Sequence, residues 1–186
     1  MKSTHTKSSH TMNDQSSFRT TLLLPAKEDP FAPFSRDQIV RFLHTHLGKY
    51  RDDAVSIGAS LDYALGTGPA EGGAVLVAYA EQERKDMHKD LHEENEDSES
   101  GKRVLGAIVI NHTHMSGYIP EHILVYIAVH AEARGQGIGR LMMEEILQVL
   151  PGGVALHVEP DNPAVRLYES MGFTSKYKEM RLERNP

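Results

Sequence analysis

The sequence predicts one domain of the mixed α/β (α+β) class, in which a central sheet of six to seven strands is flanked by about four helices. Three observations support this class. Short apolar runs typical of strands alternate along the chain with segments whose apolar residues recur at helical spacing. The run from Ile123 to Val129 is apolar at every position, as expected of a central strand buried on both faces. A glycine-rich turn follows it and leads into a helical pattern, so that a strand, a turn and a helix succeed one another.

The first half of the chain is predicted to contain two helices and three strands. Ser35 is a candidate N-cap of the first helix, because its hydroxyl can accept a hydrogen bond from a first-turn amide. Gly48 is its candidate stop, because glycine readily adopts the left-handed conformation at which many helices end. The predicted elements are a strand at 18–24, a helix at 36–47, a helix from 52 or 53 to 65, a strand at 74–80 and a strand at 104–111.

After the apolar run, the second half is predicted to contain two more helices and further strands. Pro151, Gly152 and Gly153 end the first of these helices. Asn162 is a candidate N-cap of the second helix, with Pro163 in its first turn. The predicted elements are a helix from about 137 to 150, a strand at 154–158, a helix from 163 to 171, and one or two strands within 173–182.

Charge and polarity divide the chain into an arm, a domain and an excursion. Residues 1–17 are polar and aperiodic, so a disordered arm is predicted before a domain that spans 18–186. The polar stretch 82–102 separates two predicted strands, and we interpret it as an exposed acidic excursion. Residues 81–99 hold nine acids and three bases, which accounts for the net charge of −6, because the rest of the chain has 17 of each. The neutral body argues against a nucleic-acid partner.

Composition disfavours several other classes of protein. The chain has no cysteine, hence no disulfide, no thiolate nucleophile and no cysteine-ligated metal. Its longest apolar run has seven residues, far fewer than the ~20 that a membrane-spanning helix needs. No apolar segment follows the N-terminal lysines, so no signal peptide is predicted and a cytoplasmic location is favoured. Histidines occur in pairs without further fixed ligands, so no metal site is predicted.

The glycine-rich turn carries the clearest chemical signal. Glycines at 135, 137 and 139 allow backbone N–H groups to converge without Cβ clashes, and the helix N-terminus adds partial positive charge. This combination predicts a seat for a diphosphate. A dinucleotide-binding fingerprint would need glycine or alanine at position 140, which is Arg140. Only 27 residues follow Glu159, too few to complete a doubly wound sheet, so the dinucleotide interpretation is rejected.

Two motifs in this region resemble those of a known family. Arg134-x-x-Gly137-x-Gly139 matches the pattern R/Q-x-x-G-x-G/A, and residues 162–173 (NPAVRLYESMGF) match N-x-x-A-x-x-x-Y-x-x-x-G-F, with the alanine one place early. The apolar strand before the turn resembles the bulged strand that this family carries. The chain is thus similar to the GNAT superfamily of N-acetyltransferases, and the order of predicted elements extends the resemblance from Phe18 to Leu182.

The resemblance implies a fold, an activity and partners. The sheet would splay between the strands at 123–129 and 154–158, and the pantetheine arm of acetyl-CoA would lie in the wedge between them. The implied activity is transfer of the acetyl group from acetyl-CoA, the co-substrate, to a primary amine of a small molecule, peptide or protein. The alternative is a non-catalytic acyl-CoA-binding sensor or regulatory module. Family members often dimerise, so a homodimer stays open; no metal, membrane or nucleic-acid partner is expected.

The same resemblance assigns residues to the binding of acetyl-CoA. Main-chain groups of the strand would pair with pantetheine, amides of the turn would hold the diphosphate, and the asparagine would hydrogen-bond the pantetheine arm. The implied cofactor-binding residues are Ile127, Ala128, Val129, Arg134, Gly135, Gln136, Gly137, Ile138, Gly139, Arg140, Asn162 and Tyr168.

Three residues are assigned to chemistry. By similarity, Tyr168 would protonate the departing thiolate, and the backbone amide of Ile127 would stabilise the oxyanion. The base is open, because Ile123 stands where histone-type relatives carry glutamate. Glu121 is the first choice. His122, His157, Glu159 or a chain of waters are the alternatives.

Overall fold

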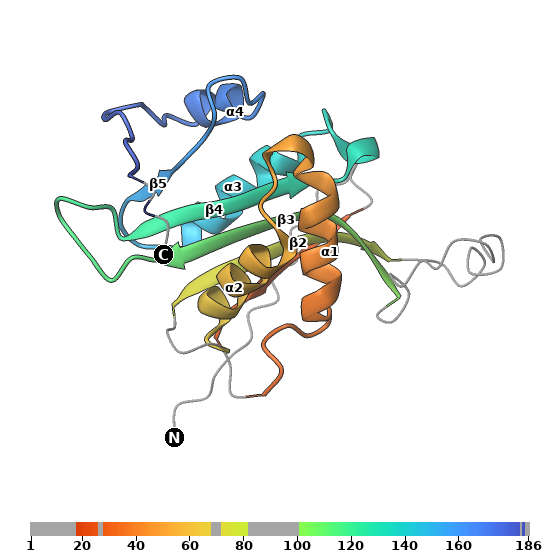
Figure 1. The fold of residues 1–186 in the computed structure, drawn as a ribbon. Coiled ribbons are helices and arrows are strands. Elements are labelled where there is room, and N and C mark those ends of the chain that lie inside the picture. The colour runs from red at the N-terminus through yellow and green to blue at the C-terminus, as the bar shows by residue number, and fades with distance from the viewer. Residues whose placement is uncertain (1–17, 26–27, 68–71, 82–100, 183, 185–186) are drawn as a thin grey trace.

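The computed structural model describes the chain except for residues 1–17, 26–27, 68–71, 82–100, 183 and 185–186 (Figure 1). The predicted N-terminal arm and nearly all of the predicted acidic excursion lie outside the described residues. The described residues form one sheet and its covering helices. Their elements are β1 (Arg19–Leu23), α1 (Arg36–His46), α2 (Ala54–Leu65), β2 (Gly73–Glu81), β3 (Lys102–His112), β4 (His122–Val129), α3 (Ile138–Val149), β5 (Val154–Leu156) and α4 (Val165–Ser170).

The sheet is mixed and its strands follow chain order. The order is β1-β2-β3-β4-β5, with antiparallel pairing from β1 to β4 and parallel pairing between β4 and β5. Figure 1 shows α1 and α2 on one face of the sheet and α3 on the other. Each face has its own buried cluster: residues of β2, β3 and β4 alternate between the cluster beneath α1 and α2 and the cluster beneath α3.

Local sequence explains where the helices begin and end. The hydroxyl of Ser35 accepts a hydrogen bond from the Gln38 amide at 3.1 Å, which confirms the predicted N-cap of α1. Asp53, one of the two candidates, caps α2 by accepting from the Ser56 amide at 2.9 Å. Gly66 ends α2 in the left-handed conformation, with φ of 70°. These three caps fix where α1 begins and where α2 begins and ends, and the buried side chains of both helices pack on one face of the sheet.

Several strands depart from the predictions. The sheet has five strands among the described residues instead of six to seven, because 173–182 forms no strand there. From residue 174 onward, its large apolar side chains, such as Met180 and Leu182, are exposed and supply no burial to order them. β5 has three residues instead of five. β3 begins at Lys102, inside the region predicted as excursion, where it pairs with Glu81 of β2.

Candidate active site

The parallel strands β4 and β5 separate after three residue pairs. His122 pairs with Val154, Ile123 with Ala155 and Leu124 with Leu156, and the described pairing goes no further. From residue 125 onward, β4 therefore keeps β3 as its only neighbour in the described sheet, and its other edge is open. This divergence is the splay that the family resemblance predicts.

A cavity of about 1040 Å³ occupies the space between the diverging strands. Its volume is at the upper end of the range typical of small-molecule sites. The wall residues come from the end of α1, the α1–α2 loop, β4, the turn before α3, the β5–α4 loop, α4 and the C-terminal segment. They include residues 46–50, Asp52, residues 123–129, Arg134, Gly139, residues 157–160, residues 162–164, Leu167, Tyr168, Glu179 and Arg181.

A β-bulge marks the point at which β4 leaves β5. Val109 of β3 pairs with Tyr126, and Ile110 pairs with Leu124, so Val125 has no partner across the ladder. Val125 and Tyr126 consequently both pack towards the cluster beneath α1 and α2, although consecutive strand residues normally point to opposite faces. The bulged strand expected from the family resemblance is confirmed.

Burial along β4 corrects one prediction from the sequence. The apolar run predicts a strand buried on both faces, but only alternate residues, among them Leu124 and Ala128, are fully buried. Ile123, Ile127 and Val129 are partly exposed and line the cavity. The run is apolar because residues 124–129 belong to or pack against the two buried clusters of the sheet, and the whole of 123–129 also contributes to the cavity lining.

The turn before α3 has the backbone that a diphosphate seat requires. Gly135 and Gly137 have φ of 77° and 82°, a left-handed conformation that side-chain-bearing residues adopt at a cost of about 1–2 kcal/mol. Gly137 is the N-cap of α3 and offers no side chain to the first-turn amides. Those amides are thus available to an anion, and the N-terminus of the helix favours one. The residues present therefore fit a diphosphate.

Three polar side chains near this turn make contacts within the protein. Arg134 donates from Nε to the Val129 carbonyl at 3.2 Å and from a terminal nitrogen to the His46 carbonyl at 2.7 Å. It therefore ties the end of β4 to the C-terminus of α1 while forming part of the cavity wall. Gln136 donates to a carbonyl at 3.1 Å, and Arg140 donates to a serine hydroxyl on α4. Neither side chain lines the cavity.

Asn162 and Tyr168 face the cavity from α4 and the loop before it. The N-cap of α4 is Ala164, and Asn162 lies two residues earlier, where its Oδ1 accepts a hydrogen bond from the Ala164 amide at 2.9 Å. The predicted capping position is therefore wrong. The bond is nevertheless informative, because it uses the amide oxygen and leaves the Asn162 NH₂ group as a donor towards the cavity.

Tyr168 is a buried tyrosine on this wall of the cavity. Its side chain is 8% exposed and packs edge-on against Phe173, with ring centroids 5.9 Å apart. Burial raises the pKa of Tyr168 to about 12, so the hydroxyl stays protonated at neutral pH. No described residue makes a hydrogen bond with that hydroxyl. Tyr168 therefore adds a protonated hydroxyl-bearing side chain to the cavity lining.

The structure places the candidate bases at different sites. The Glu121 carboxylate accepts the Gly153 amide at 2.7 Å, which lowers its pKa, and it does not line the cavity. His122 is buried, with Nε2 2.9 Å from the Pro151 carbonyl oxygen. Both hold the start of β4 to the start of β5. His157 and Glu159 do line the cavity, from the segment after β5.

Sequence reasoning missed a carboxylate on the opposite wall. Tyr126, on β4, donates from its hydroxyl to the Asp52 carboxylate at 2.6 Å, and both residues line the cavity. Burial, then the hydrogen bond to Asp52, raise the pKa of Tyr126. The available signal was the pair Asp52-Asp53 before a helix: one carboxylate caps the helix, so the other is left for a different role.

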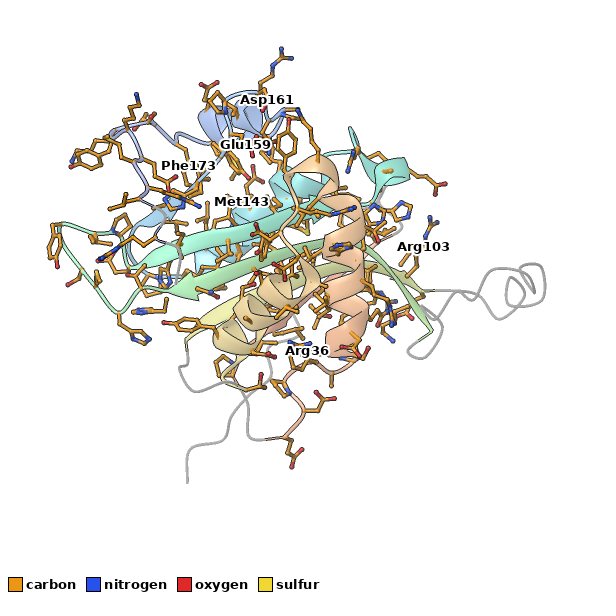
Figure 2. The ribbon with its side chains drawn as sticks, in the orientation of Figure 1. Arg36, Arg103, Met143, Glu159, Asp161 and Phe173 are labelled. Carbon is orange, nitrogen blue, oxygen red and sulfur yellow. The ribbon has the colours of Figure 1, made fainter. Side chains whose placement is uncertain are left out.

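Two loops meet across the cavity. Lys49 lies 2.5 Å from the Asp161 carboxylate, and the Tyr50 hydroxyl donates to the Asp161 carbonyl at 3.0 Å. Figure 2 shows Asp161 and Glu159 between α4 and the C-terminal end of α1. The α1–α2 loop and the β5–α4 loop thus bridge the wedge, and two of the bridging residues, Lys49 and Tyr50, are also part of its lining.

Comparison with known proteins agrees with this geometry. The model of the acetyltransferase (GNAT) domain family matches residues 72–175, more than half of the chain. The chain belongs to the GNAT acetyltransferase family. The matched region runs from β2 through α4 and contains the bulge, the glycine turn and Tyr168. No curated protein matches the chain by sequence.

Solved GNAT structures share the fold at low sequence identity. An acetyltransferase of the GNAT family from Streptococcus pneumoniae is 16% identical, with 91% of this chain and 99% of that chain covered and a TM-score of 0.56. An aminoglycoside acetyltransferase from an uncultured soil metagenomic sample, in complex with trehalose, is 14% identical, with 91% and 97% covered and a TM-score of 0.55. Ard1 from Thermoplasma volcanium is 16% identical, with 83% and 82% covered and a TM-score of 0.51.

Two further kinds of feature are absent from the part of the chain that the structure describes. No helix there is long and apolar enough to cross a membrane. No three histidine, aspartate or glutamate side chains there are grouped so that they could hold a metal ion.

Proposed function

We propose that this protein transfers the acetyl group of acetyl-CoA to a primary amine of a small molecule, a peptide or a protein. One observation carries the proposal: β4 and β5 diverge at a bulge, and the resulting cavity has Tyr168 on one wall and the glycine turn before α3 at its margin. Family membership supports the use of acetyl-CoA.

The chain offers acetyl-CoA three kinds of contact. Main-chain groups of Ile127 and Val129 lie on the open edge of β4, where an extended pantetheine arm can pair as a further strand would. Amides from Gly135 to Arg140 at the start of α3 suit the diphosphate. The free NH₂ of Asn162 suits a pantetheine carbonyl.

Two groups then serve the reaction. The Ile127 amide, one residue past the bulged pair, stabilises negative charge as it develops on the acetyl oxygen. Tyr168 protonates the thiolate that leaves when the C–S bond breaks, and its raised pKa keeps the proton available until then. Enclosure between the two bridging loops limits water at the thioester. Glu121 has no part in this proposal, because its carboxylate lies outside the cavity lining.

Two measurements test the proposal on the full chain. Calorimetry should detect binding of acetyl-CoA, and a thiol-release assay should detect free CoA when a panel of primary amines is added. The panel should include a polyamine, an aminoglycoside, a lysine-containing peptide and a simple alkylamine. Binding without thiol release on any acceptor would favour the non-catalytic acyl-CoA-binding module. Absence of binding would overturn the proposal.

A further inference from the structure

A carboxylate of the cavity lining is held by a residue of the bulged strand. Tyr126 is 7% exposed, and its hydroxyl reaches the Asp52 carboxylate at 2.6 Å. Hydrogen bonds to an ionised acceptor are shorter and stronger than those between neutral groups, so the bond holds Asp52 in a defined orientation. The residue that orients Asp52 directly precedes Ile127, the residue whose amide is proposed to stabilise the oxyanion.

Asp52 also differs from two other charged groups of the cavity wall, Glu179 and Lys49. Glu179 pairs with Arg181, and Lys49 pairs with Asp161, so their charges are compensated. Asp52 receives its described hydrogen bond from a neutral hydroxyl, which orients the carboxylate without cancelling its charge. The remaining ionisable wall residues are His46, Tyr50, Arg134, His157, Glu159 and Tyr168.

We infer that Asp52 receives the ammonium form of the acceptor amine and accepts its proton, and that Tyr126 is the residue that positions Asp52. The inference rests on the proposed acetyl transfer and names the substrate class of that site: amines that carry a positive charge at neutral pH. The bulge that opens β4 to acetyl-CoA thus also orients, through Tyr126, the group that prepares the acceptor.

The protons balance as follows. The ammonium gives one proton to the Asp52 carboxylate, which passes it to solvent, and the neutral amine forms the C–N bond. The nitrogen loses a second proton as the C–S bond breaks, and that proton replaces, through water, the one that Tyr168 gives to sulfur. The net products are the acetamide, CoA thiol and one proton released to solvent for each ammonium consumed.

The test compares Asp52→Asn with Asp53→Asn in steady-state kinetics on the best cationic acceptor of the panel. Asparagine at position 52 can still accept the Tyr126 hydrogen bond but carries no charge. Asparagine at position 53 removes the negative charge of the residue adjacent to Asp52 and remains a good N-cap for α2. We expect Asp52→Asn to lower kcat/KM at pH 7 by about 100-fold, with acetyl-CoA affinity unchanged, and Asp53→Asn to leave kcat/KM near the wild-type value.

The pH profile separates proton transfer from structural damage. A lysine-like amine has a pKa of about 10, so raising the pH supplies neutral amine without a base. The deficit of Asp52→Asn should therefore shrink from pH 7 to pH 9.5, and it should be small for trifluoroethylamine, which is largely neutral at pH 7. Tyr126→Phe should show a smaller deficit of the same pH dependence, of about tenfold, because the carboxylate remains but is less well placed.

The outcomes distinguish this inference from the proposed function. Should wild-type protein acetylate no amine, the proposed function fails first. Should wild type be active while Asp52→Asn matches Asp53→Asn, or show a deficit independent of pH, the inference about Asp52 is overturned and acetyl transfer stands. A pH-dependent deficit in Glu159→Gln instead of Asp52→Asn would assign the role to the opposite wall and equally overturn it.

Discussion

The two halves of β4 have different structural roles, although both are largely apolar. Residues 122–124 pair on both sides, with β3 and with β5, and His122 at their start is buried. Residues 125–129 pair only with β3 in the described structure, and their other edge faces the cavity. The bulge at Val125 separates the two halves. One strand thus provides both the support for the wedge and one of its walls.

The comparison shows how polar groups are used in each half. At the start of the paired half, His122 and the preceding residue Glu121 bond to backbone groups of the segment that leads into β5. In the open half, Tyr126 bonds to a carboxylate, and the main-chain edge is left for a ligand. Changes in the open half should therefore alter binding and turnover, whereas changes in the paired half should alter stability.

The largest effect is expected from Tyr168→Phe, on the wall opposite the open half of β4. Loss of the hydroxyl removes the proton donor for the thiolate, so kcat should fall by about 100-fold or more while the Kd of acetyl-CoA is unchanged. Tyr118→Phe is the matched control, because that tyrosine is 84% exposed in the β3–β4 loop. Equal kcat values for the two variants would remove Tyr168 from the mechanism.

A smaller effect is expected in the turn that continues from the open half. Alanine at Gly137 must hold a left-handed φ of 82°, which disfavours the native turn by about 1–2 kcal/mol and should weaken acetyl-CoA binding about tenfold. Gly117→Ala is the matched control: it imposes the same left-handed strain, with φ of 79°, in the β3–β4 loop outside the cavity lining, and its Cβ would meet no atom within 4 Å. Calorimetry that finds equal affinities for both variants would contradict a preorganised seat.

Directly before the paired half, Glu121→Gln should lower stability and leave kcat unchanged. Its folded-state pKa is lowered, chiefly by the Gly153 amide, so its contribution to the free energy of unfolding is present above its ordinary pKa and lost as pH falls through the lowered value. The variant should have a slightly lower Tm at pH 7 and the same Tm as wild type in strong acid. A large loss of kcat would instead restore Glu121 as the base.

The smallest effect is expected from His112, the residue of β3 that pairs with His122 at the start of the paired half. The pKa of His112 is lowered by burial and then by the charges of its neighbours His122 and His114. A lowered folded-state pKa means that the unfolded chain binds the proton more tightly, so the free energy of unfolding should decrease as pH falls below about 6.5. Tm measured between pH 8 and 5.5 should fall slightly less in His112→Asn than in wild type. An identical slope would contradict this assignment.

Much of the candidate site could be predicted from local patterns. The glycine turn, Asn162 and Tyr168 belong to contiguous motifs whose spacing is set by one turn and one helix, and the structure brings Gly139, Asn162 and Tyr168 to one cavity. Helix caps such as Ser35 could likewise be predicted from the sequence, because a cap depends on residues that are three apart.

Other features depended on distant segments. Asp52 and Tyr126 are 74 residues apart, and no local pattern joins them. The length of β5 is set by where β4 diverges from it, and the lack of a strand at 174–182 reflects apolar side chains that find no core. Glu121 looks well placed in sequence, two residues before Ile123, but the fold turns its carboxylate to Gly153.

The sequence by itself determined the family, the order of elements and the position of the glycine turn, because these follow from short-range backbone preferences and the spacing of apolar residues. Only the tertiary structure decided where β4 and β5 part, and so which stretch of β4 has an open edge towards a cavity. It also decided that Asp52 meets Tyr126 in the lining of that cavity, because this hydrogen bond joins segments that are distant in the sequence.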